Sequence, residues 1–183
     1  MVYIVLGTGF EPVEAVAPCD ILRRGGVEVQ FAGIGGTQIE GGHGIRVQAD
    51  CRAEEMNLDA AEMVILPGGM GGVRSILADA HTLAFVREAY AAGKYVAAIC
   101  AAPSIILGGM GLLEGRRATC YPGMEDGMTG ATPVKANAVT DGKIITGCGV
   151  GGALDFACEL ITALCGKVKA DEIAESVVHH VYG

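Results

Sequence analysis

The chain has 183 residues, enough for one buried core but short for two, so we expect a single domain over residues 1–183. Its 13 basic and 21 acidic residues give a formal net charge of −8 at neutral pH. This charge argues against direct binding to nucleic acid or to anionic membranes, because both attract basic surfaces.

The seven cysteines are odd in number and include no C-x-x-C pair, which argues against a disulfide framework and a zinc site. The sequence starts directly with an apolar strand pattern, and no run reaches the ~20 apolar residues that a membrane span needs. We therefore expect a cytoplasmic protein that requires neither a metal nor an organic cofactor.

Short apolar runs alternate with helical patterns along the chain. In the first half, strands are predicted at 2–6, 27–34, 63–66 and 95–99, and helices at 12–24, 73–77 and 82–92. In the second half, strands are predicted at 118–120, 134–139 and 143–146, with helices at 152–164 and 170–179. A turn at Asp141-Gly142 joins the last two strands. This alternation predicts a doubly wound, mostly parallel sheet with helices on both faces and a ligand site beyond the carboxyl ends of the strands.

Cys100 ends the apolar strand 95–99 and is followed by small residues and a helical run over 101–107. This is the layout of a nucleophile elbow, in which a sharp turn lifts a reactive side chain above the sheet. The N-terminal end of the following helix should lower the pKa of the thiol and favour the thiolate. The alternative is a buried core cysteine that behaves as a small apolar residue.

Two other strand exits should converge on Cys100. Gly68 and Gly69 follow the strand 63–66 and can turn backbone N–H groups toward an oxyanion, with the N–H of Ala101 as the usual companion donor, although an ordinary turn is the alternative. The first strand leads to Glu11 and Glu14. Spacing alone favours these two as acidic residues stabilised by a helix N-terminus, while leaving open that one of them faces the sulfur.

Ordered motifs over nearly the whole chain resemble the ThiJ/PfpI family, closest to the branch of the Parkinson-disease-associated protein deglycase. The motifs are Glu11-Pro12-Val13-Glu14 with Pro18, Asp20 and Arg23-Arg24-Gly25; Leu66-Pro67-Gly68-Gly69; Ala98-Ile99-Cys100-Ala101-Ala102-Pro103; and Ala118-Thr119-Cys120-Tyr121-Pro122.

The resemblance implies a flavodoxin-like fold of the class I glutamine amidotransferase type. It also implies that Cys100 is an oxidation-sensitive nucleophile and that Glu14 is a protonated acid beside it, which leaves the helix-terminus interpretation for Glu11 alone. Family members usually form homodimers that pair through the first helix. Arg24 is therefore expected to approach the Glu14 region of the partner subunit.

Several positions depart from the family pattern. Ala101 stands where peptidase-like members have a histidine, which removes the main support for a Cys-His protease. Tyr121 replaces a histidine that is frequent in the deglycase branch, and with a pKa near ~10 a tyrosine is a poor base at neutral pH. His43 and Cys148 occupy positions where a relative holds anions with two arginines, which weakens the case for anionic substrates. Tyr121, His43 and Cys148 are candidates for lining the site.

Together these features predict a cysteine-dependent enzyme that acts on reactive dicarbonyls or their adducts, as a glyoxalase without glutathione or a protein deglycase. Its substrate would be a small carbonyl compound or a glycated protein. One alternative is a redox sensor or redox-regulated chaperone that works through oxidation of Cys100. Further alternatives are an amidase or peptidase and a role related to thiazole monophosphate synthesis.

Overall fold

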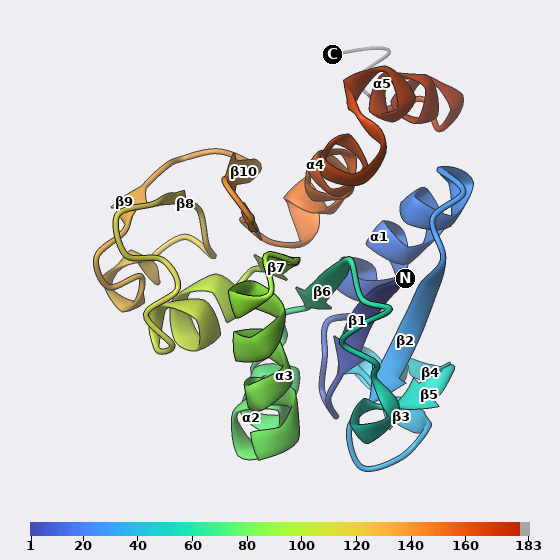
Figure 1. The fold of residues 1–183 in the computed structure, drawn as a ribbon, viewed down its shortest axis with the longest axis vertical. Helices are drawn as coiled ribbons and strands as arrows, with labels where there is room; N and C mark the ends of the chain where they lie inside the picture. Colours follow the sequence, from blue (N-terminus) through green and yellow to red (C-terminus); the bar gives the residue numbers. More distant parts are fainter. Residues whose placement is uncertain (180–183) are drawn as a thin grey trace.

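A central sheet of seven strands organises the computed structural model, which describes residues 1–179 (Figure 1). The strand order is β10-β11-β7-β6-β1-β2-β5. All neighbouring strands pair in parallel except β10 with β11. The strands are β1 (Val2–Leu6), β2 (Val29–Gly33), β5 (Cys51–Arg52), β6 (Met63–Leu66), β7 (Tyr95–Ile99), β10 (Ala138–Asp141) and β11 (Ile144–Gly147). The last four residues of the expected domain lie outside the described residues.

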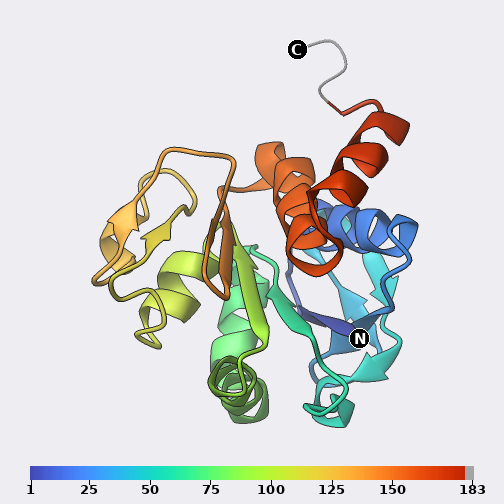
Figure 2. The ribbon, with the colours of Figure 1, turned by 45° about the horizontal axis from the view of Figure 1, so that its top comes forward.

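Helices cover both faces of this sheet, as Figure 2 shows. One face carries α1 (Pro12–Arg24), α4 (Ala153–Cys165) and α5 (Lys167–Ser176). The other carries α2 (Met70–Ala78), α3 (Ala80–Ala91) and the π-helix η3 (Pro103–Gly108). Successive residues of β1 belong to opposite cores, since Ile4 packs with α1 and α4 while Val5 packs with α2 and α3. A strand buried on both faces must be apolar throughout, and this confirms the doubly wound sheet expected from the sequence.

Two short ribbons lie outside the central sheet. They pair β3 (Gln38–Glu40) with β4 (Arg46–Gln48), and β8 (Arg117–Ala118) with β9 (Thr132–Pro133). Short 3-10 helices complete the described chain: η1 (Gly42–Gly44), η2 (Ala53–Glu55), η4 (Glu125–Gly127) and η5 (Val150–Gly152).

The predicted strand over 134–139 is wrong at its start, because the chain there still belongs to the β8–β9 ribbon. The amide of Val134 donates to the carbonyl of Ala118, and β10 begins only at Ala138. The predicted turn at Asp141-Gly142 is confirmed, with Gly142 at φ 61° between β10 and β11. No helix within residues 1–179 is both long and apolar enough to cross a membrane.

Candidate functional site

Cys100 occupies a sharp bend directly after β7. Its backbone has φ 67°, a conformation that costs energy in a residue other than glycine. Two backbone hydrogen bonds hold the bend: the Cys100 amide donates to the carbonyl of Gly147 over 2.9 Å, and its carbonyl accepts from the amide of Tyr121 over 2.8 Å. The thiol is half-buried. The main chain on both sides therefore fixes where the sulfur points, and the strain is retained by the surrounding structure.

Glu14 brings a buried acid to this bend from α1. Its side chain is completely buried, and its Oε2 accepts a hydrogen bond of 2.9 Å from the amide of Gly68. Its other oxygen, Oε1, is buried without a hydrogen-bond partner among the described residues. The Cys100 thiol lies within hydrogen-bonding reach of the same carboxyl group. The acid and the thiol thus form a pair at the carboxyl ends of β6 and β7.

Gly68 lets these two side chains meet. A Cβ at this position would lie 2.6 Å from the Cβ of Cys100 and 2.6 Å from Oε2 of Glu14. Its amide hydrogen is directed to Glu14, so Gly68 positions the acid and does not take the oxyanion role suggested by the sequence.

Replacing Gly68 by alanine should therefore push Glu14 and Cys100 apart. Overpacking of this kind costs about 1–3 kcal/mol of stability, and we expect both weaker stability and a loss of Cys100 reactivity. Urea unfolding and the rate of Cys100 alkylation measure the two effects. Gly42→Ala is the matched control, because its new Cβ would approach no atom closer than 3.6 Å. Wild-type alkylation rates in Gly68→Ala would show that the close approach has no chemical consequence.

Burial raises the pKa of the Glu14 carboxyl to about 7, far above that of an exposed glutamate. The Gly68 amide and the Cys100 thiol oppose this rise by hydrogen bonding to the carboxylate, while the negative charge of Glu11 adds to it. Glu14 consequently exchanges its proton close to neutral pH, the range that suits a general acid and base.

The pKa of the Cys100 thiol is raised to about 12, contrary to the lowering expected from the sequence. Burial is the main cause, and the neighbouring Glu14 carboxylate adds to it, whereas the amides of Ala101 and Gly69 favour the thiolate but do not outweigh these effects.

Two acids this close do not both ionise near neutral pH: below about pH 7 both groups are mainly protonated, and above it the pair holds one negative charge and one shared proton. The proton resides on sulfur with a Glu14 carboxylate, or on the carboxyl group with a Cys100 thiolate. In the first form Glu14 is placed to accept the proton as the sulfur attacks. The two forms together supply a nucleophile and its base from side chains on separate elements.

Two backbone amides lie within hydrogen-bonding reach of the sulfur. They belong to Ala101, directly after Cys100, and to Gly69, at the N-terminus of α2. Gly69 has φ 79°, and a Cβ there would lie 2.5 Å from the carbonyl oxygen of Gly9, so only glycine fits this turn. A negative oxygen on an atom bonded to the sulfur would find donors here.

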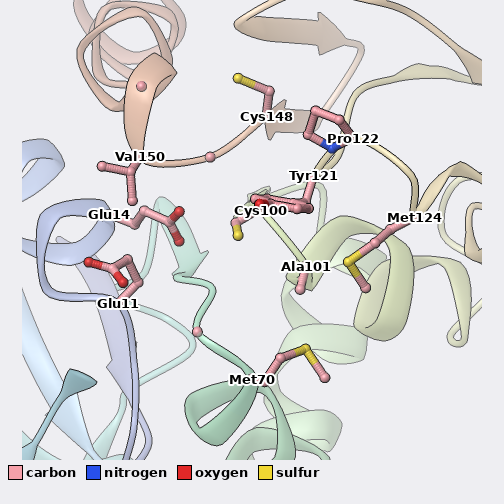
Figure 3. A pocket seen from close by; sticks show the side chains of 13 residues that line it. Glu11, Glu14, Met70, Cys100, Ala101, Tyr121, Pro122, Met124, Cys148 and Val150 are labelled. Atoms are coloured by element: carbon pink, nitrogen blue, oxygen red, sulfur yellow. The ribbon is translucent and has the colours of Figure 1, made fainter. Parts of the chain in front are cut away.

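A cavity of about 580 Å³ opens above the pair (Figure 3). Its walls are mostly apolar, and the lining residues are Glu11, Glu14, Gly69, Met70, Cys100, Ala101, Tyr121, Pro122, Met124, Cys148, Gly149, Val150 and Gly151. The structure thus brings Tyr121 and Cys148 to the cavity. It does not bring His43, which is exposed on η1, or Arg24, which is exposed and pairs with Asp20 over 2.8 Å.

Sequence reasoning missed Met70, Pro122 and Met124 and two further parts of this lining. Glu11 was interpreted only as a helix-terminus residue, and the segment 149–151 was not considered. The second had a usable signal, because the glycine-rich run 147–152 directly follows β11 and so marks a further strand exit at the same edge of the sheet.

The sequence profile of the DJ-1/PfpI family matches residues 1–163. The chain belongs to the DJ-1/PfpI family. This confirms the family resemblance identified from the motifs. Cys100 and Glu14 both lie within the residues that the family profile matches.

Relatives in the DJ-1/PfpI family extend over most of the chain. It is 38% identical over 177 residues to protein DJ-1 homolog A of Arabidopsis thaliana, covering 94% of this chain but 45% of that protein. It is 31% identical to protein dj-1beta of Drosophila melanogaster, covering 96% and 95% of the two chains. A protein named deglycase from Pyrococcus abyssi is 36% identical over 79% of this chain and 87% of its own. The chain thus spans less than half the length of the Arabidopsis relative.

Solved structures of the DJ-1 group share the fold. Oxidized DJ-1 of Toxoplasma gondii superposes with a TM-score of 0.93 at 31% identity and covers 98% of each chain. Drosophila melanogaster DJ-1beta superposes with a TM-score of 0.91 at 30% identity, covering 97% of this chain and 96% of the other. The fold is therefore flavodoxin-like α/β.

Proposed function

We propose that this chain is a cysteine-dependent enzyme that converts reactive dicarbonyls or their adducts, with Cys100 as nucleophile and Glu14 as proton carrier. The observation that carries the proposal is Oε1 of Glu14, a buried carboxyl oxygen without a partner among the described residues, beside the sulfur and at the cavity wall. A Cβ on Gly149 would lie 3.7 Å from this oxygen and 4.0 Å from the sulfur of Cys100, so both atoms border one point of the cavity. With its proton on Oε1, Glu14 can donate a hydrogen bond to the oxygen of a bound carbonyl compound.

The first step forms a carbon–sulfur bond. The Cys100 sulfur adds to the aldehyde carbon of a dicarbonyl while Glu14 accepts the thiol proton. The aldehyde oxygen takes up the electron pair of the carbonyl bond, and the amides of Gly69 and Ala101 stabilise its negative charge. Glu14 then returns its proton to this oxygen, which completes a hemithioacetal.

The second step moves a hydrogen within the adduct. The Glu14 carboxylate removes the proton from the carbon bonded to sulfur and delivers it to the neighbouring carbonyl carbon. The hydroxyl of the hemithioacetal passes its own proton to the oxygen of that neighbouring carbon. One carbon is oxidised and the other reduced, so no external oxidant is required. Water then hydrolyses the resulting thioester and releases Cys100. The product is lactate from methylglyoxal and glycolate from glyoxal.

A redox role is the second candidate, because the same carboxylic proton and amides would stabilise a Cys100 sulfinic acid. In such a sensor or redox-regulated chaperone, peroxide would add two oxygens to the sulfur. Two assays separate the candidates: lactate formation from methylglyoxal by the purified protein, and intact mass after titration with peroxide. We expect turnover. Two added oxygens at low peroxide with no lactate would favour sensing instead.

An amidase or peptidase has less support, because no histidine of the described chain lines the cavity with Cys100.

We further propose that the chain is a single domain over residues 1–183, that it acts in the cytoplasm, and that it forms homodimers through α1. Helix α1 exposes Val13 and Val16, each at 44%, which supports pairing along this helix and would bring Arg24 to the partner subunit. Light scattering at micromolar concentration tests this, and a monomeric mass would contradict it.

A further inference from the structure

Glu11 is a cavity residue that the mechanism above does not use. It precedes the first turn of α1, but its side chain makes no capping hydrogen bond. Its backbone is fixed, because its amide donates to the carbonyl of Gly68 over 3.0 Å. Its carboxylate is half-buried and has neither a hydrogen bond nor an ion pair among the described residues. In Figure 3 it lies beside Glu14 at the cavity wall.

The charges around the cavity have a single sign. Of the residues that line it, the ionisable carboxyls are Glu11 and Glu14, and no lysine, arginine or histidine of the described chain is among them. Apart from the hydroxyl of Tyr121 and the thiols of Cys100 and Cys148, which are uncharged as thiols and phenol, the remaining wall is apolar or glycine. The charge of Glu11 acts within the cavity, since it contributes to the raised pKa of Glu14.

We propose that Glu11 is a specificity-determining residue that excludes anionic carbonyl compounds from the cavity and admits neutral and cationic ones. An anion entering here would lose hydration without gaining a cationic partner, and it would approach a fixed carboxylate. A neutral dicarbonyl meets no such barrier, and a cationic adduct would be attracted. The choice of substrate class rests on the proposed function, whereas the exclusion of anions from Cys100 does not.

Alkylation of Cys100 by two reagents of nearly equal size tests the charge selection without any turnover. Iodoacetamide is neutral and iodoacetate is anionic, and mass spectrometry reports the rate at Cys100 itself. For Cys100, the iodoacetamide rate divided by the iodoacetate rate should be about tenfold higher than the same ratio measured for 2-mercaptoethanol. This is the size expected for one charge at short range in a partly hydrated site. Glu11→Gln should remove most of this excess, and 1 M salt should reduce it in the wild type.

Two variants control for general effects. Glu11→Asp keeps the charge and should keep the ratio high, whereas Glu88→Gln removes one exposed carboxylate of α3, outside the cavity, and should leave the ratio unchanged. A wild-type ratio equal to that of 2-mercaptoethanol, or a ratio that does not respond to Glu11→Gln, would overturn the proposal.

Substituted phenylglyoxals extend the test to substrates. We expect wild-type kcat/KM for 4-carboxyphenylglyoxal to be about tenfold below that for 4-methylphenylglyoxal, and Glu11→Gln to narrow this gap. If Glu11→Gln changed kcat/KM by the same factor for both compounds, this result would contradict charge selection. If no variant converts either compound while the alkylation ratios behave as expected, the proposed function fails and the exclusion of anions by Glu11 stands.

Discussion

Replacing Cys100 by serine abolishes lactate formation from methylglyoxal, with an expected loss of at least about 10³-fold in kcat/KM. The hydroxyl of serine is far less acidic and less nucleophilic than a thiol, and Glu14 is too weak a base to compensate. The site stays assembled, because the backbone bonds of residue 100 to Gly147 and Tyr121 do not involve its side chain.

Cys165→Ser is the matched control, since this cysteine is exposed at the end of α4 and away from the cavity. It should retain wild-type turnover, and circular dichroism should show that both variants are folded. Lactate formation by folded Cys100→Ser at the wild-type rate would eliminate the covalent mechanism.

Glu14→Gln should lower kcat/KM by about 10²- to 10⁴-fold, the usual contribution of a positioned general acid and base. The amide has nearly the same shape, and its carbonyl oxygen can still accept from Gly68, but it cannot take the thiol proton. Loss of turnover in Glu14→Gln, with Cys100 still present, would show that the reaction needs proton transfer by Glu14 in addition to nucleophilic attack by the sulfur. Unchanged turnover would assign the proton transfer to another group.

The same substitution should change how stability depends on pH. The folded-state pKa of Glu14 is about 7 against 4.5 for an ordinary glutamate, so between these values the folded protein keeps a proton that the unfolded chain has released. The free energy of unfolding therefore falls as pH rises from about 4.5 to 7, by about 3 kcal/mol from this group. Urea unfolding of Glu14→Gln should lack this decrease, whereas Glu88→Gln should retain it.

The sequence predicted the middle strands of the central sheet and α1 well for physical reasons, but it missed the two-residue edge strand β5. The strands β1, β6 and β7 are buried on both faces, so each reads as a continuous apolar run. Pro12 at the first turn marks the start of α1. Of the β3–β4 and β8–β9 ribbons, only β8 was anticipated, by the strand predicted at 118–120, because these strands have two or three residues each and show no apolar period.

Two properties of the site depended on information that a sequence does not contain. The spacing of Glu11 and Glu14 cannot tell which is buried, and only the family resemblance assigned Glu14 to the sulfur. The pKa of Cys100 was predicted in the wrong direction because the following helix was expected to outweigh the burial of the thiol and Glu14 was expected to be protonated. Both properties depend on desolvation, which is a property of the folded molecule.

The shared proton of Glu14 and Cys100 is tested most directly by ¹³C NMR of protein labelled at glutamate carboxyl carbons. The account predicts one carboxyl resonance that titrates near pH 7 and disappears in Glu14→Gln, while the other glutamates titrate at lower pH. If the Glu14 resonance titrates near 4.5 like an exposed glutamate, burial beside Cys100 does not raise the pKa of this acid, and the account of a proton shared by Glu14 and Cys100 near neutral pH is contradicted.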